Sequence, residues 1–232
     1  MVLLALLGAC SIAMLRPAHS LDKLSASGNL GVLVDPAFSP ELSGCFDPAS
    51  GGVCQLPAQS PLDLEYRLGL GRGFELGARG LLPPRALSLK YAFLDERRHR
   101  TSVSLAVQVE AGAQVTVDDG PLAPFPVALV PFARGDLLAS GTSRLGPNMQ
   151  FRPVGSVGWW VESRGAPTPD QGLGWTAGVF LPVRIPGGFA VAPVVGVSGW
   201  FPARHVTEVY ARFGLAIEPW LDRPGPRIPA AP

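Results

Sequence analysis

The sequence contains few charged residues and almost no lysine. Only 16% of its 232 residues are charged, against about 25% in ordinary soluble domains, and Lys23 and Lys90 are the only lysines. The net charge is +1 and no basic stripe or nucleic-acid-binding motif is present, which excludes nucleic acid as a partner. Three histidines rule out most histidine-based metal sites. With 47% hydrophobic residues, the chain lacks the charged surface that a water-exposed domain needs.

What the sequence does have is alternation with a period of two. In LDLEYRLGLGRGFELGARG, residues 62–80, apolar residues occupy every second position and charged residues fall between them. The same pattern resumes after the Gly71-Arg72-Gly73 pivot. A period of two is that of a β-strand, and two such runs joined by glycines predict a hairpin.

The alternation recurs along the chain and predicts about ten strands, with eight to twelve possible. Most runs have 9–13 residues, which is the length a tilted strand needs to cross a bilayer. Short connections at 71–73, 95–100 and 186–188 fall on one side, and the long 45–54 and 163–173 segments fall on the other. One connection, 135–147, is expected to be long on the short-turn side. The predicted fold is all-β, an antiparallel up-and-down transmembrane β-barrel.

Aromatic residues are expected at both membrane interfaces, where bilayers favour them. In this topology Trp159, Trp160, Trp175 and Trp200 lie near the outer strand ends, and Phe74, Phe93, Phe132, Phe189 and Trp220 lie near the inner ends. Prolines at 131, 153, 182 and 193 fall inside predicted strands, where a closed barrel has no edge to accommodate them.

The second face of the strands distinguishes a membrane barrel from a soluble, lipocalin-like binding barrel. That face carries small residues with occasional charges, which suits a narrow lumen better than a solvated surface. An arginine turned toward lipid would cost about 2–4 kcal/mol at mid-bilayer. We therefore predict that the charged side chains face the lumen and neutralise one another: Glu65, Arg67, Glu75, Arg79, Lys90, Glu110, Arg152, Arg184, Glu208 and Arg212.

The N-terminal region, residues 1–20, is interpreted as an export signal because it is apolar and short. Leu7-Gly8-Ala9-Cys10 resembles the bacterial lipobox, which implies lipidation of Cys10. Two alternatives remain open: cleavage of a plain signal peptide near Ala18-His19-Ser20, and a buried N-terminal segment. Export would leave Cys45 and Cys54 as a pair in a short loop, and we predict a disulfide between them.

The signal region with Cys10, LEYRLGLGRGFELGARG, LSLKYAFL and YARFGLAIEPW together resemble a small bacterial outer-membrane β-barrel protein of a lipoprotein-like kind. The resemblance covers residues 21–220 as the barrel, followed by a Pro-rich tail at 221–232. It implies location in the bacterial cell outer membrane, outer-membrane lipid as surroundings, barrel-assembly machinery during biogenesis, and a monomer.

The sequence carries no convergent catalytic group. His205, with Thr207 and Glu208 at the predicted outer rim, is the one candidate for a lipid-modifying enzyme, but threonine is an uncommon nucleophile. No cofactor or metal site is predicted, since Asp118-Asp119-Gly120 lacks the ligands that calcium needs. The expected function is that of a non-enzymatic envelope barrel with a structural, surface-binding or small-solute-passage role. The rim-active enzyme and the soluble binding barrel are the alternatives.

Overall fold

The structure is a computed structural model of the 232-residue chain. It describes residues 15–34, 46–47, 52–53, 62–80, 85–99, 101, 103–117, 127–163, 169–202 and 208–220. Most of the residues in these ranges are in strands.

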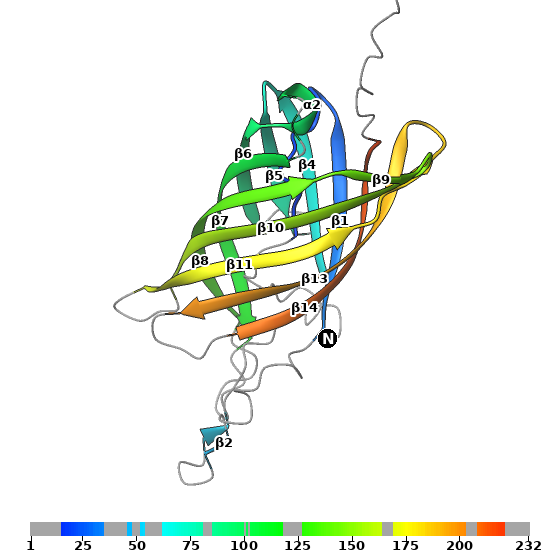
Figure 1. The fold of residues 1–232 in the computed structure, drawn as a ribbon. Helices are drawn as coiled ribbons and strands as arrows, with labels where there is room; N and C mark the ends of the chain where they lie inside the picture. The colour runs from blue at the N-terminus through cyan, green and yellow to red at the C-terminus, as the bar shows by residue number, and fades with distance from the viewer. Residues whose placement is uncertain are drawn as a thin grey trace, which may run out of the picture.

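Ten long antiparallel strands close into a barrel, which confirms the predicted fold class (Figure 1). Neighbours in sequence pair with one another around the ring, and β14 returns to pair with β1. The strands of the ring, in order, are β1 (Ala26–Val34), β4 (Leu62–Gly71), β5 (Phe74–Arg79), β6 (Ala86–Leu94), β7 (Val103–Val117), β8 (Val127–Gly141), β10 (Met149–Glu162), β11 (Asp170–Phe180), β13 (Phe189–Pro202) and β14 (Glu208–Pro219). Short strands β9 (Ser143–Gly146) and β12 (Val183–Ile185) extend the ring locally, and β2 (Phe46–Asp47) pairs with β3 (Gly52–Val53).

The predicted hairpin over residues 62–80 is formed by β4 and β5. Its two-residue turn has left-handed backbone at Arg72 (φ 54°) and Gly73 (φ 93°), with Gly71 also positive (φ 88°). Glycine adopts this region without steric cost, so the Gly-Arg-Gly pivot sets the turn. The register places Leu68 opposite Leu76 and Glu65 opposite Arg79. All the apolar residues therefore share one face and all the charged residues share the other.

The two ends of the barrel differ. One end carries the tight turn at 72–73, the turn at 147–148, the turn at 186–188 and the four-residue helix α2 (Glu96–His99). The opposite end is the one near β2 in Figure 1. No helix within the described ranges combines the length and apolar character required to cross a membrane.

Strand β8 corrects two expectations. It continues to Gly141 and is followed directly by β9, so residues 135–147 are not a long connection. Gly135-Asp136 looks like a turn in sequence, yet both residues pair continuously with β7. Because β8 is longer than expected, Phe132 lies near its start, level with Trp160 at a ring-centroid distance of 5.8 Å, and not at the inner end.

Three of the four prolines sit inside barrel strands, and Pro182 lies between β11 and β12. Pro131, Pro153 and Pro193 all point outward. A proline removes one ladder donor but no hydrogen-bond acceptor. Their direction follows from strand alternation, since each of the three prolines neighbours a buried residue, and each ring therefore lies on the outer surface of the barrel.

The distribution of polarity is the reverse of that in a soluble protein. Exposed side chains on the strands are predominantly large and apolar, including Leu76, Val107 and Leu137, whereas Glu65, Lys90 and Glu110 are buried. A lipocalin-like barrel lines its interior with the apolar face, so this arrangement excludes the soluble alternative. A closed antiparallel barrel with an apolar exterior and a polar interior is the architecture of transmembrane β-barrels.

Candidate functional site: the lumen of the barrel

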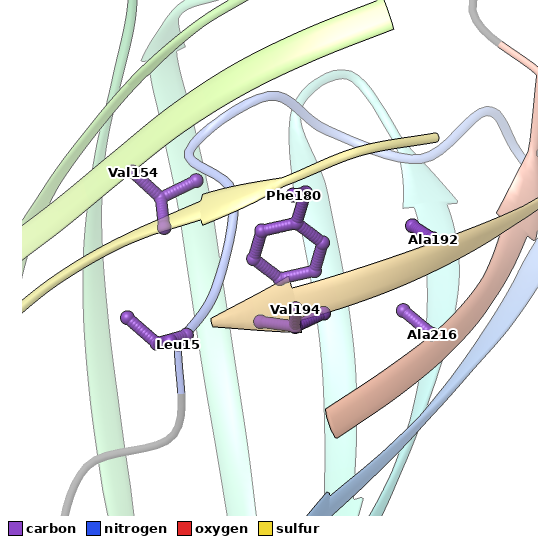
Figure 2. Close-up of a cluster of buried hydrophobic side chains, with 6 residues drawn as sticks. All are labelled: Leu15, Val154, Phe180, Ala192, Val194 and Ala216. Carbon is purple, nitrogen blue, oxygen red and sulfur yellow. The ribbon is translucent and has the colours of Figure 1, made fainter. Parts of the chain in front are cut away.

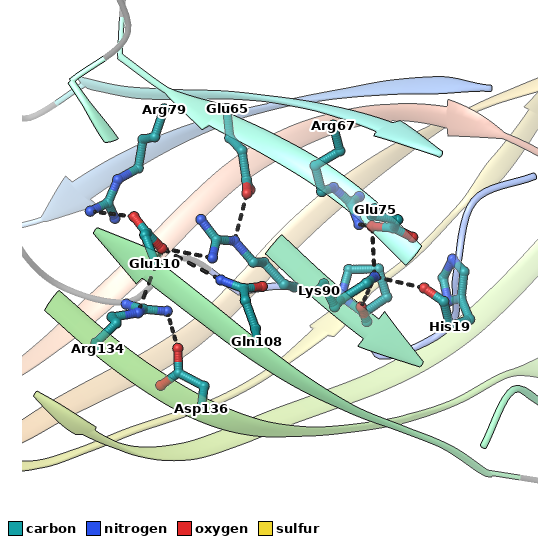
Figure 3. A network of polar contacts seen from close by, with 12 residues as sticks. His19, Glu65, Arg67, Glu75, Arg79, Lys90, Gln108, Glu110, Arg134 and Asp136 are labelled. Atoms are coloured by element: carbon teal, nitrogen blue, oxygen red, sulfur yellow. Dashed lines mark hydrogen bonds and ion pairs between the residues drawn. The ribbon is translucent and has the colours of Figure 1, made fainter. Parts of the chain in front are cut away.

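Consecutive strands β4 to β8 line one side of the lumen with charged and amide side chains, which we call the charged wall (Figure 3). Strand alternation sends every second residue inward, so each strand contributes one or two of them. The charged wall consists of Glu65, Arg67, Glu75, Arg79, Lys90, Gln108, Glu110, Arg134 and Asp136.

Glu110 is the centre of the charged wall. One of its carboxylate oxygens lies 2.8 Å from the Arg79 guanidinium, and the other lies 2.8 Å from Arg16 and 3.5 Å from Arg134. Arg134 also pairs with Asp136 at 2.6 Å. Burial makes an isolated charge costly. The carboxylates of Glu110, Asp136 and Glu65 together balance the three buried guanidinium charges of this cluster.

A second cluster of the charged wall surrounds Lys90. Its ammonium group lies 2.8 Å from a Glu75 carboxylate oxygen, and Arg67 lies 3.7 Å from the same oxygen. Every one of these side chains is at most 5% exposed. This part of the lumen is thus filled by paired charges.

On the opposite side of the lumen, a cluster of buried apolar side chains lies beside buried polar residues such as Thr176 and Glu218, and we call this cluster the apolar wall (Figure 2). It is formed by β10, β11, β13 and β14 through Val154, Phe180, Ala192, Val194 and Ala216. Phe180, Ala192 and Ala216 are completely buried. Small residues here leave room that the long side chains of the charged wall do not fill.

Residues 15–21 of the chain occupy the space between the two walls. Every residue from Leu15 to Leu21 is buried. Leu15 joins the apolar wall, and its Cδ1 atom would lie 2.8 and 2.7 Å from a Cβ placed on Gly178 and Gly196. These two glycines therefore provide the space for the leucine side chain.

Arg16, the next residue, turns to the charged wall. Its guanidinium lies 2.6 Å from Glu65 and 2.8 Å from Glu110. The adjacent side chains of Leu15 and Arg16 therefore contact the two walls at once.

The backbone of this segment is bound by side chains of the barrel. Lys90 donates to the carbonyl oxygens of Pro17 (3.1 Å) and His19 (2.8 Å), while the Ala18 amide donates to Ser140 (2.9 Å). The Ser20 amide and hydroxyl donate to Asp95 at 3.0 and 2.6 Å, and the Leu21 amide donates to Glu75 at 2.5 Å. Buried backbone groups need such partners, and the lumen supplies them as a binding site would.

A separate polar network lies close to α2. Thr142 donates to Glu96 through its amide (3.0 Å) and its hydroxyl (2.5 Å), and Arg152 reaches Thr142 at 3.3 Å. Arg152 also pairs with Glu218 on β14. The network joins α2, β10 and β14 through buried polar groups.

The structure places the residues expected in the lumen as follows. Seven of them are buried inside the barrel: Glu65, Arg67, Glu75, Arg79, Lys90, Glu110 and Arg152. Arg184 is a correction, since it is exposed on β12 with its guanidinium 5.7 Å from the Trp220 ring centroid. The short strand β12 extends the ring locally by pairing with β10 and β13, and all three of its residues are exposed, so none of them faces a closed lumen. The side chains of Glu208 and Arg212, and all of Cys10, Cys45, Cys54 and His205, lie outside the described residues.

The alternation of its strand places the uncharged Gln108 on the same face as Glu110, whereas Arg16, Arg134, Asp136 and Glu218 were missed as lumen residues. Glu218 is in a strand that the sequence predicts, and it lies an even number of residues after Arg212, which gives its direction. Arg134 and Asp136 were hidden by the turn-like Gly135-Asp136 pair. Arg16 lies in a segment without a period of two, so no pattern indicates its position.

The arrangement offers burial and charge pairing rather than reaction chemistry. Among the described residues, no group of three or more histidine, cysteine or acidic side chains is placed to hold a metal ion. The carboxylates of the charged wall are engaged by guanidinium or ammonium groups. What the lumen does hold is the Leu15–Leu21 segment of this chain, which bends at Ala18 and His19.

No family model matches the chain, and no curated protein matches it either. A search of solved structures finds the β domain of the Bordetella autotransporter BrkA, with 10% sequence identity and a TM-score of 0.41. The match covers 85% of this chain and 99% of that domain. A likeness at this level identifies neither family nor activity.

The class of protein therefore rests on the architecture itself. Ten antiparallel strands close without an edge, the exterior is apolar, and the interior is charged and filled. These are the features of an outer-membrane-type β-barrel.

Proposed function

We propose that this protein is a non-enzymatic β-barrel of the bacterial outer membrane, with a structural or surface-binding role. The observation that supports this most strongly is the reversed polarity of the barrel. Large apolar side chains such as Val109 and Leu137 face outward from strands long enough to cross a bilayer, while the charges are inside. Water would not be a suitable solvent for this exterior.

A filled lumen favours a closed scaffold over an open pore. The charged wall, the apolar wall and Leu15–Leu21 between them occupy the interior. Barrels of this size leave little space once side chains fill them. Small-solute passage therefore requires Leu15–Leu21 to move.

The remaining features of the proposal concern how the barrel sits in the envelope. The α2 end, with its tight turns, faces the periplasm, as short connections do in outer-membrane barrels. Outer-membrane lipid surrounds a monomeric barrel that is inserted by barrel-assembly machinery. Cys10 carries a lipid and Cys45 pairs with Cys54.

Cell fractionation with a heat-shift gel tests the proposal. The protein should co-sediment with outer membranes, and an unheated sample should migrate differently from a boiled one because the closed barrel resists detergent. Purified protein reconstituted in a planar bilayer should show no steady conductance. Recovery in the soluble fraction without heat-modifiable migration would contradict the membrane assignment, and a large steady conductance would contradict the closed scaffold.

Metabolic labelling with a fatty-acid probe tests the lipid anchor. The wild type should be labelled and Cys10→Ser should not, because the thiol is the acylated group. Equal labelling of the two proteins would contradict lipidation at Cys10. Intact-mass analysis after alkylation, with and without reductant, tests the Cys45–Cys54 bond in the same preparation.

A further inference from the structure

We propose that the lumen is a peptide-binding site whose ligand is this chain's own Leu15–Leu21 segment, and that the segment remains in the mature protein as a plug fastened by Arg16. This inference rests on the proposed function as a closed barrel and adds the identity of the segment that closes it. It also makes a definite statement about processing: the chain is cut upstream of Leu15 and not near Ala18-His19-Ser20.

Complementarity of charge supports the proposal. Arg16 is the cation 2.6 Å from Glu65, a carboxylate that is 1% exposed, and it also pairs with Glu110. Removing residues 15–20 would take this guanidinium away and leave the Glu65 carboxylate buried in the lumen. Uncompensated buried charge is strongly unfavourable, so the barrel is built to contain Arg16.

Complementarity of shape supports it independently. Leu15 packs against Val194 and Phe180, and the glycines at 178 and 196 leave space for it. At the other end of the segment, a Cβ on Gly69 would lie 2.9 Å from the Leu21 Cβ. Strand glycines weaken a strand and often mark a close approach by another backbone. Here Gly178 and Gly196 lie against Leu15, and Gly69 lies against Leu21 and the backbone of Asp22, where the chain leaves the plug.

Recognition of the backbone is the third observation. Lys90 binds two carbonyl oxygens of the segment, and Ser140, Asp95 and Glu75 accept from its amides. These contacts come from β6, β8, β5 and the residue that precedes α2. A segment that is bound by side chains from several strands has the contacts of a bound ligand. A leader that is removed after export does not need such contacts.

The first measurement is the intact mass of the protein purified from outer membranes. The mature chain should begin at or upstream of Leu15. A mature chain that begins after Leu15 would overturn the proposal, and the heat-shift gel would show whether the barrel itself stands without the segment.

The second measurement is thiol accessibility in isolated outer membranes. Ser20→Cys places a thiol, called the plug thiol below, at a fully buried position of the segment, in a background of Cys45→Ser and Cys54→Ser. The parent background without Ser20→Cys reports any labelling of Cys10. A water-soluble maleimide should leave the plug thiol unlabelled in the folded barrel and label it after denaturation.

Charge reversal at Arg16 then tests the fastening. Arg16→Glu places a carboxylate beside Glu65 and Glu110, so labelling of the plug thiol should become at least ~10-fold faster. Arg98→Glu is the matched control, because Arg98 is exposed on α2 and the same reversal there should leave the plug thiol protected. Arg16→Glu with Glu65→Arg should restore much of the protection.

A heat-shift gel accompanies every variant, so loss of the barrel is not mistaken for release of the plug. If Arg16→Glu fails to assemble, Arg16→Gln takes its place with the same expected direction. Rapid labelling of the plug thiol in a heat-modifiable barrel that retains Arg16 would overturn the proposal. So would equal protection in Arg16→Glu and Arg98→Glu.

Discussion

The two walls of the lumen use opposite means to fill the same space. The charged wall on β4 to β8 fills it with long side chains whose charges are paired, as around Glu110. The apolar wall, one part of the lumen surface of β10, β11, β13 and β14, packs alanine, valine and one phenylalanine around Leu15. Paired buried charges are weak evidence for stability but are very sensitive to loss of one partner. Apolar packing loses stability in proportion to the atoms removed. The comparison predicts that the two walls will respond differently to mutation.

The largest effect is expected where the charged wall loses its centre. Glu110→Ala leaves Arg16, Arg79 and Arg134 without their common carboxylate. The free energy of unfolding should fall by about 3–5 kcal/mol, since breaking a buried pair leaves uncompensated charge. Urea unfolding in detergent, followed by the heat-shift gel, measures it. A loss below about 1 kcal/mol would show that the arginines reach other partners.

A somewhat smaller effect is expected on the exterior. The Leu137 side chain is 47% exposed and lies on the outer face between Val107 and Val157. Leu137→Arg places a guanidinium at this position. Toward lipid it should cost about 2–4 kcal/mol near the bilayer midplane. Leu145→Arg on β9, outside the ring of long strands, is the control and should cost less. Equal stability of Leu137→Arg and the wild type in refolding from urea into lipid vesicles would argue against a lipid-facing exterior.

The apolar wall should respond least. Val194→Ala removes two methyl groups from a site that is 6% exposed, beside Leu15. We expect a loss of about 2 kcal/mol from burial and the small cavity. The same urea titration compares it with Glu110→Ala. A larger loss for Val194→Ala than for Glu110→Ala would reverse the relation between the two walls.

The alternation of apolar and polar residues along the strands accounts for the part of this structure that could be predicted from the sequence. Glu65 and Glu75 could be placed on one face because a strand gives each side chain its direction and a one-residue slip would reverse them all. The length of β8 was not predictable, because Gly135-Asp136 resembles a turn and pairing with β7 overrides that local signal. Arg184 was misplaced because it lies on the short strand β12, where all three residues are exposed.

The lumen segment escaped prediction for a different reason. Leu15–Leu21 follows an apolar leader and contains Pro17, and it has no period that assigns an element or a face. Its position is set by tertiary partners, Glu65 and Glu110 for Arg16 and the apolar wall for Leu15. Such partners are distant in sequence, so local patterns carry no information about them.

The central claim is that the apolar face of the barrel contacts lipid and the polar face lines a filled lumen. Site-specific labelling in intact membranes tests this claim most directly. Single cysteines at Leu76 and Leu137, in a background lacking Cys45 and Cys54, should resist a water-soluble maleimide and react with a lipid-dissolved thiol probe. A cysteine at the fully buried, inward-facing Ser104 should resist both probes. Reaction of the first two cysteines with the water-soluble reagent, or their protection from both probes, would contradict the account.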